Sequence, residues 1–68
     1  MDSVARVTTI TARSDASFED AIRVAIERAS RTLRNLSAAW VKEQKVKIVD
    51  GAISEWEVIL EVTFVLDD

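Results

Sequence analysis

Hydrophobic and polar residues alternate most regularly near the end of the chain. Between Ile53 and Leu66, one set of alternate positions is entirely apolar and consists of Trp56, Val58, Leu60, Val62, Phe64 and Leu66. The intervening positions are mixed and consist of Glu55, Glu57, Ile59, Glu61, Thr63 and Val65. A period of two is typical of a strand with one buried face. We therefore predict a strand here whose apolar face covers a helix.

A second pattern, with a period of three to four, begins at Phe18. Its apolar positions are Phe18, Ile22, Ala25, Ala29, Leu33 and Leu36. Ser17 is followed three residues later by Asp20, an arrangement that resembles a capping box. These features predict one amphipathic helix of about five turns that begins just after Ser17.

Two further segments are typical of strands. Residues from Val4 to Ala12 are rich in β-branched side chains. The stretch from Ala38 to Val49 alternates less regularly, and we predict a bulge near Gln44. The pair Asp50-Gly51, which contains the only glycine, is a strong turn signal and predicts a hairpin with the last strand.

The order of these elements predicts an α+β fold, in which a βαββ protomer wraps a three-stranded antiparallel sheet on one helix. Residues 1–68 would form a single domain, since 68 residues leave room for no more. One sheet with one helix leaves the far face of the sheet uncovered. Because 49% of the residues are hydrophobic, we expect copies of the chain to cover that face in a closed homo-oligomer.

The composition of the chain excludes several kinds of site and partner. The chain has no cysteine and no histidine, which excludes disulfides, thiolate metal sites and imidazole chemistry. Its net charge is −3, and the nine basic residues are scattered, so we expect no nucleic-acid partner. No signal-peptide pattern and no apolar run of ~18 residues is present, so we expect no membrane partner and a cytoplasmic location.

The carboxylates of the last strand allow two chemical interpretations. Glu55 and Glu57 would lie ~6.6 Å apart and could be read as an acid and base pair. So small a subunit lacks the cleft that a hydrolase needs, and we predict that the chain is not an enzyme. Glu57 and Glu61 could instead bind a hard cation such as calcium, if symmetry brings several copies together.

Several segments, taken in order, resemble one known family. They are T-L-R-N-L at 32–36, a strand bearing Trp40, the turn Asp50-Gly51, and E-W-E-V-I-L-E-V-T-F-V-L at 55–66. Over nearly its whole length the chain resembles dodecins. The resemblance implies a hollow homododecamer of βαββ subunits that binds flavins (riboflavin, FMN or FAD) at subunit interfaces, for storage rather than turnover.

The resemblance also implies which residues would contact such a ligand. In flavin-binding dodecins a Trp early in the second strand stacks on the ring, and a Gln on the third strand contacts its polar edge. Here Ala38 stands at the Trp position, Trp40 follows two residues later, and Glu57 replaces the Gln. Trp40 would then stack, and Glu57 with Gln44 would make polar contacts. Two alternatives stay open: a cage that binds calcium through Glu57 and Glu61, and a purely structural shell.

Overall fold

The computed structural model describes residues 2–67. Three strands and one helix follow one another as β1 (Ala5–Ser14), α1 (Phe18–Ser30), β2 (Leu36–Val49) and β3 (Ala52–Val65). β3 lies between β1 and β2 and is antiparallel to both. The predicted βαββ fold is confirmed, and each strand end lies within two residues of its predicted position.

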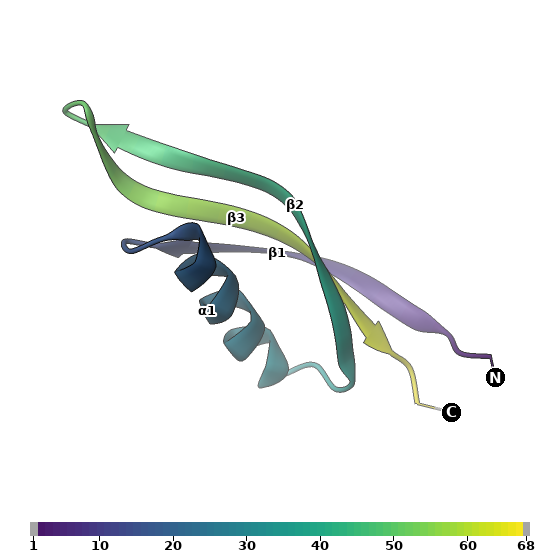
Figure 1. The fold of residues 1–68 in the computed structure, drawn as a ribbon. Helices are drawn as coiled ribbons and strands as arrows, with labels where there is room; N and C mark the ends of the chain where they lie inside the picture. Colours follow the sequence, from purple (N-terminus) through teal and green to yellow (C-terminus); the bar gives the residue numbers. More distant parts are fainter. Residues whose placement is uncertain (1, 68) are drawn as a thin grey trace.

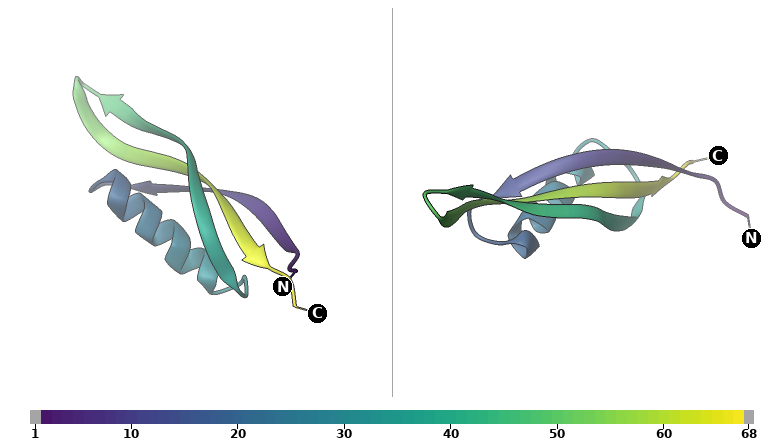
Figure 2. Two further views of the ribbon diagram at one scale, coloured as in Figure 1. Left: turned by 45° about the vertical axis from the view of Figure 1, so that its right-hand side comes forward. Right: turned by 90° about the horizontal axis from the view of Figure 1, so that it is seen from above.

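The helix lies against one face of the curved sheet, and Figures 1 and 2 show that the opposite face carries no other element of residues 2–67. α1 packs mainly on β1 and β3. Its buried side chains are all alanines, which lets the helix approach the sheet closely, and they meet the fully buried row of β3. The core consists of Ala21, Ala25, Val58, Leu60 and Val62. The predicted apolar face of the last strand is thus confirmed as the face under the helix.

The helix is shorter than the sequence pattern predicts, because it ends at Ser30 instead of continuing toward Leu36. The backbone N–H groups of Thr32 and Leu33 both donate to the carbonyl of Ala29, at 3.1 and 2.9 Å. Asn35 then adopts a left-handed φ of 62° and turns the chain into β2. Leu36, the first residue of β2, packs against the same core as the helix. Leu36 therefore fits the apolar spacing of the helix although it belongs to a strand.

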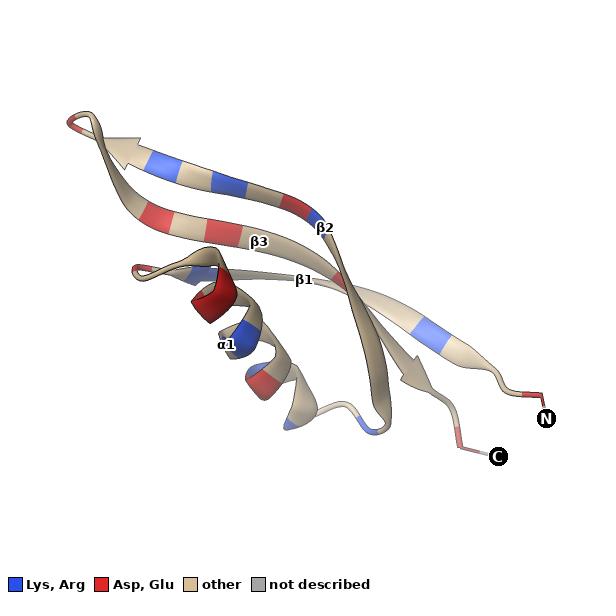
Figure 3. Ribbon diagram, viewed as in Figure 1, with Lys and Arg blue, Asp and Glu red and all other residues tan. Residues whose placement is uncertain are grey.

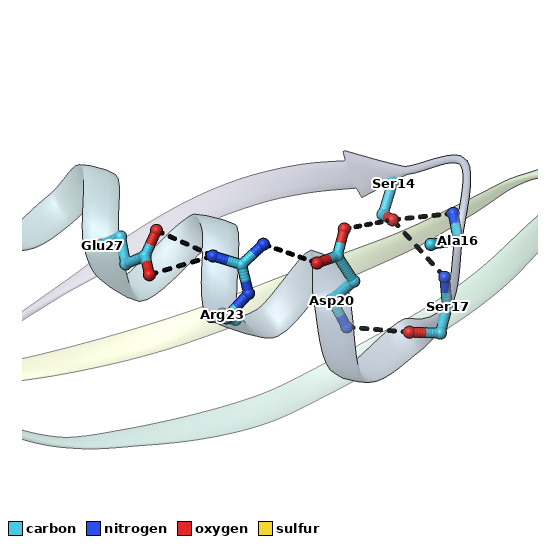
Figure 4. Close-up of polar contacts among 6 residues, drawn as sticks. All are labelled: Ser14, Ala16, Ser17, Asp20, Arg23 and Glu27. Carbon is cyan, nitrogen blue, oxygen red and sulfur yellow. Dashed lines mark hydrogen bonds and ion pairs between the residues drawn. The ribbon is translucent and has the colours of Figure 1, made fainter.

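A small polar network fixes the junction between β1 and α1 (Figure 4). The Oγ of Ser14 donates to Asp20 Oδ2 at 2.7 Å and accepts from the backbone N–H of Ala16 at 2.9 Å. Ser17 caps the helix as predicted, since its Oγ accepts from the backbone N–H of Asp20 at 3.0 Å. The hydrogen bond from Ser14, followed by that from Arg23, holds the pKa of Asp20 below its ordinary value. The end of β1 is therefore tied to the first turn of the helix.

The hairpin turn has the geometry that its sequence predicts. Asp50 and Gly51 have φ values of 52° and 78°, so both central residues are left-handed, as a type I′ turn requires. β2 pairs with β3 through three irregularities of register, and the middle one, between Val41 and Glu43, lies next to the bulge predicted near Gln44. These irregularities decide which β2 side chains share a face.

Candidate functional site

The candidate site lies on the face of the sheet that points away from the helix, here called the open face. Cross-strand pairing places side chains of three strands in rows, because directly opposed residues point to the same side. The rows on the open face are Val7–Thr63–Ala38, Thr9–Glu61–Trp40, Thr11–Ile59–Glu43 and Arg13–Glu57–Lys45. Figure 3 shows the acidic residues of β3 facing basic residues of β2.

Glu57 is the centre of the most strongly paired row. Arg13 Nε on β1 lies 2.8 Å from Glu57 Oε1, and Lys45 Nζ on β2 lies 3.1 Å from Oε2. The side chain is only 13% exposed. The hydrogen bond from Lys45 is the largest cause, with Arg13 contributing, of a pKa below the ordinary value. Glu57 is therefore a carboxylate at neutral pH, with one cationic donor on each oxygen.

Glu61 lies two rows away and has weaker partners. Thr9 Oγ1, directly opposite on β1, donates to Glu61 Oε2 at 3.2 Å. Lys42 Nζ lies 3.5 Å from Oε1. This second carboxylate thus has one neutral and one charged partner, and it stands beside Trp40.

Trp40 is the most exposed aromatic side chain of the sheet, with 63% of its surface accessible. It shares the open face with Ala38, because the irregularities of β2 lie before Ala38 and after Val41. Ala38 adds no bulk beside the indole. Trp56, by contrast, is half-buried and pairs with Ser14 and Val46 on the opposite face. The two tryptophans therefore belong to different surfaces.

Not all of the predicted ligand residues come together in one protomer. Gln44 pairs with the buried Val58 and therefore points to the helix side of the sheet, away from Trp40 and Glu57. Glu57 is four residues along β3 from Glu61, the partner of Trp40, which corresponds to ~13 Å. A ligand that touches Gln44 and Glu57 would have to contact more than one protomer.

The candidate metal residues are likewise apart. Glu57 and Glu61 share the open face but are separated by the row that contains Ile59. Within residues 2–67, no group of three or more acidic side chains is placed to hold a metal ion. A cation site built from these two glutamates would need carboxylates from neighbouring copies.

Four residues at this site were not anticipated from the sequence. Arg13 and Lys45 flank Glu57, while Thr9 and Lys42 contact Glu61. Only the register of the three strands brings them together, and the pattern of β1 and β2 alone does not fix that register. The alternation of β1 places Thr9 and Arg13 on one face of that strand, but only the pairing shows that Glu61 and Glu57 lie on the same face.

Comparison with known proteins agrees with this architecture. The family model described as Dodecin matches residues 4–67. The chain belongs to the dodecin family. A dodecin from Thermus thermophilus is 35% identical over 68 residues, with 100% of this chain and 99% of that protein covered.

Solved dodecin structures have the same fold. The dodecin from Streptomyces davaonensis superposes with a TM-score of 0.93 at 40% identity, and both chains are covered completely. A calcium dodecin from Mycobacterium tuberculosis, described as calcium chelating with a novel calcium-binding site, superposes with a TM-score of 0.81 at 32% identity, over 96% of this chain and 93% of that one. Within residues 2–67, the one helix is too short and too polar to cross a bilayer.

Proposed function

We propose that the chain assembles into a hollow homododecamer that sequesters a flavin, such as riboflavin, FMN or FAD, between subunits, as a non-catalytic storage protein of the cytoplasm. The observation that carries the proposal is Trp40, a large aromatic side chain exposed on a sheet face that no other element of residues 2–67 covers. Membership of the dodecin family supports the same role.

Trp40 suits the binding of a planar aromatic ring. An indole offers a broad π-face, and aromatic pairs stack in offset arrangements that add to the gain from burying their area. An exposed tryptophan costs free energy in water unless something covers it. Ala38, on the same face, leaves room for a ring to approach along the strand.

The row around Glu57 supplies a matching polar pattern. The edge of a flavin presents one N–H between two carbonyl groups, which are acceptor, donor and acceptor in turn. Glu57 can only accept, whereas Arg13 and Lys45 can only donate, and each has N–H groups beyond the one bonded to Glu57. The row thus offers donor, acceptor and donor. The two cations therefore compensate for the repulsion that a carboxylate alone would exert on the carbonyls.

The geometry of one protomer supports a site shared between copies. Trp40 and the Glu57 row are ~13 Å apart along β3, and Gln44 points to the other face. We assign the stacking contact to Trp40, polar contacts to Glu57 and Gln44, and the space beside the indole to Ala38, with different copies contributing different groups.

Equilibrium dialysis against riboflavin, with the free flavin measured by its own fluorescence, tests this proposal in every variant. We expect the wild type to bind riboflavin and Trp40→Ala to bind it roughly tenfold more weakly, since stacking on an aromatic side chain contributes ~1–3 kcal/mol. Trp56→Phe is the matched control, because Trp56 lies on the opposite face, and it should bind like the wild type. Unchanged affinity in Trp40→Ala, or no binding by the wild type, would refute the flavin proposal.

Calcium binding is a second candidate, because one structural relative is described as a calcium dodecin. In this chain Glu61 is the better candidate ligand, since its cationic partner is more distant than either of those on Glu57. A ligand that binds only the folded state raises the melting temperature. Calcium should therefore stabilise the wild type but not Glu61→Gln if this candidate is correct. Insensitivity to both flavin and calcium would indicate a structural shell.

A further inference from the structure

The open face has two zones, and Trp40 stands at their boundary. On one side of the indole lies the row Val7–Thr63–Ala38, in which the exposed Val7 and Ala38 are apolar. On the other side the rows contain charged residues, beginning with Glu43 in the next row. A ring that stacks on Trp40 therefore has an apolar surface at one end and a polar surface at the other.

Glu61 is the polar residue directly opposite the indole. It pairs with Trp40 across β2 and β3, and the Cβ atoms of directly opposed residues are ~5 Å apart. Glu57, by contrast, lies four residues farther along β3, or ~13 Å from that row. Within one protomer, a group attached to a ring on Trp40 therefore meets Glu61 before it meets Glu57.

Two side chains hold the Glu61 carboxylate in place. Thr9 Oγ1 donates to Oε2 at 3.2 Å, and Lys42 Nζ lies 3.5 Å from Oε1. Lys42 is the residue that the register shift between Val41 and Glu43 skips, and such a bulge re-aims a side chain. The carboxylate is thus fixed beside the indole but stays accessible, with 23% of the Glu61 side chain exposed.

The Glu61 carboxylate has acceptor sites to spare for hydroxyl groups. A carboxylate offers about four lone-pair sites, and the contacts with Thr9 and Lys42 use one on each oxygen. Neighbouring hydroxyls donate well to a carboxylate, as they do to the acidic residue that binds ribose in dinucleotide-binding folds. The Lys42 ammonium has further N–H groups for a hydroxyl oxygen. The row therefore matches a polyhydroxyl chain.

The charges around the indole disfavour an anionic chain. Two carboxylates, Glu61 and Glu43, and one ammonium, Lys42, lie in the row of Trp40 and the row next to it, which leaves one negative charge in excess. A phosphate monoester carries about −1.5 to −2 charges at pH 7. A chain that ends in phosphate is therefore repelled, whereas a neutral chain of hydroxyl groups is not.

We infer that the row of Thr9, Glu61 and Lys42 sets the specificity for the side chain of the ligand on Trp40, and that it selects a neutral polyhydroxyl chain. The inference rests on the proposed flavin binding and adds which part of the ligand this row binds. Riboflavin, which carries a ribityl chain, belongs to this class. Lumichrome is a related ring without the chain, and FMN adds a phosphate to it. The Glu57 row keeps its role at the polar edge of the ring, which all three compounds share.

Equilibrium dialysis against riboflavin, lumichrome and FMN, each measured by its own fluorescence, tests the inference. We expect the wild type to bind riboflavin roughly tenfold more tightly than lumichrome, since one hydrogen bond to a charged group contributes about that factor. We also expect FMN to bind more weakly than riboflavin. Glu61→Gln should weaken riboflavin, strengthen FMN relative to riboflavin and leave lumichrome unchanged, because an amide has fewer acceptor sites and no charge.

Glu57→Gln is the matched control, because it is the same substitution on the same strand and the same face. It should change the affinities for the three compounds by a similar factor, since they share the polar edge of the ring. A change confined to the compounds that carry a chain is expected only from the variant at Glu61.

The pattern of affinities separates the outcomes. Equal affinity of the wild type for riboflavin and lumichrome, or tighter binding of FMN than of riboflavin, would overturn the inference while leaving flavin binding in place. Equal losses for all three compounds in Glu61→Gln would overturn it as well. The wild-type preference decides the inference even if a variant does not fold. If the wild type binds none of the three compounds, the proposed flavin function and this inference fail together.

Discussion

The two faces of β3 carry alternate residues of one strand, yet they differ sharply in burial and in charge. On the helix side, Val58, Leu60 and Val62 are completely buried. On the open face, Glu57 and Glu61 lie among cations from both neighbouring strands. The helix side is completed within one chain, so its side chains determine the fold. The open face is not completed within one chain, so its residues are available for a ligand or another copy.

Truncation on either face should show this difference most clearly. Leu60→Ala should lower the free energy of unfolding by ~2–5 kcal/mol, because it leaves a cavity under the helix. Ile59→Ala, one residue away on the open face, should cost distinctly less. Urea denaturation at one fixed protein concentration measures both. Equal losses would mean that the open face is packed as tightly as the core.

The polar junction between β1 and α1 holds the helix on its face of the sheet. Ser14→Ala removes the donor to Asp20 and the acceptor for two backbone N–H groups, so we expect a loss of ~1–3 kcal/mol in unfolding free energy. Ser54→Ala is a suitable control, because that exposed hydroxyl makes one long bond to the carbonyl of Lys47. A similar loss of unfolding free energy in both variants would show that the Ser14 network stabilises the protein no more than an exposed hydroxyl does.

A substitution in the hairpin turn tests the effect of backbone conformation without any change in packing. A Cβ at Gly51 would meet nothing within 4 Å, but the residue has a φ of 78°. Gly51→Ala should therefore destabilise the protein by ~1–2 kcal/mol through the left-handed conformation only. Asp50→Asn, which keeps a residue that tolerates this region, should be nearly neutral in the same thermal melt. A neutral Gly51→Ala would mean that the turn relaxes to another type.

Acid should destabilise the folded protein by protonating Glu57 on the open face. Its pKa is lower in the folded chain than the ordinary value of 4.5, so the ionised form favours folding. That contribution is complete above pH ~4.5 and is lost as pH falls through the lower folded pKa. Glu57→Gln should flatten the decline in melting temperature over this range. The decline should not vanish, because the pKa of Asp20 is shifted in the same direction. An unchanged pH profile would contradict the pairing of Glu57.

Patterns that repeat along the chain predicted the fold well. Alternation identified β3 and its buried face, and Ser17 and Asp50-Gly51 marked the start of the helix and the hairpin turn. The end of the helix was missed because Leu36 packs on the same core from a strand, so hydrophobic spacing could not distinguish the two.

The candidate site was less predictable, because it depends on register between strands. Trp40 and Ala38 lie on one face, as residues two apart on a regular strand do, so this pair could be placed from spacing alone. Gln44 lies on the other face because of the irregularity between Val41 and Glu43. The partners of Glu57 come from β1 and β2, and pairing over such sequence distances is not visible in the spacing of either strand.

Native mass spectrometry of the purified chain, with and without riboflavin, tests most directly the claim that the open face functions only between copies. The account predicts the mass of a homododecamer of 7.6 kDa chains, and a heavier species when riboflavin is added. A stable species at 7.6 kDa under the same micromolar conditions would contradict it, because a single protomer would then tolerate an uncovered sheet face and an exposed Trp40.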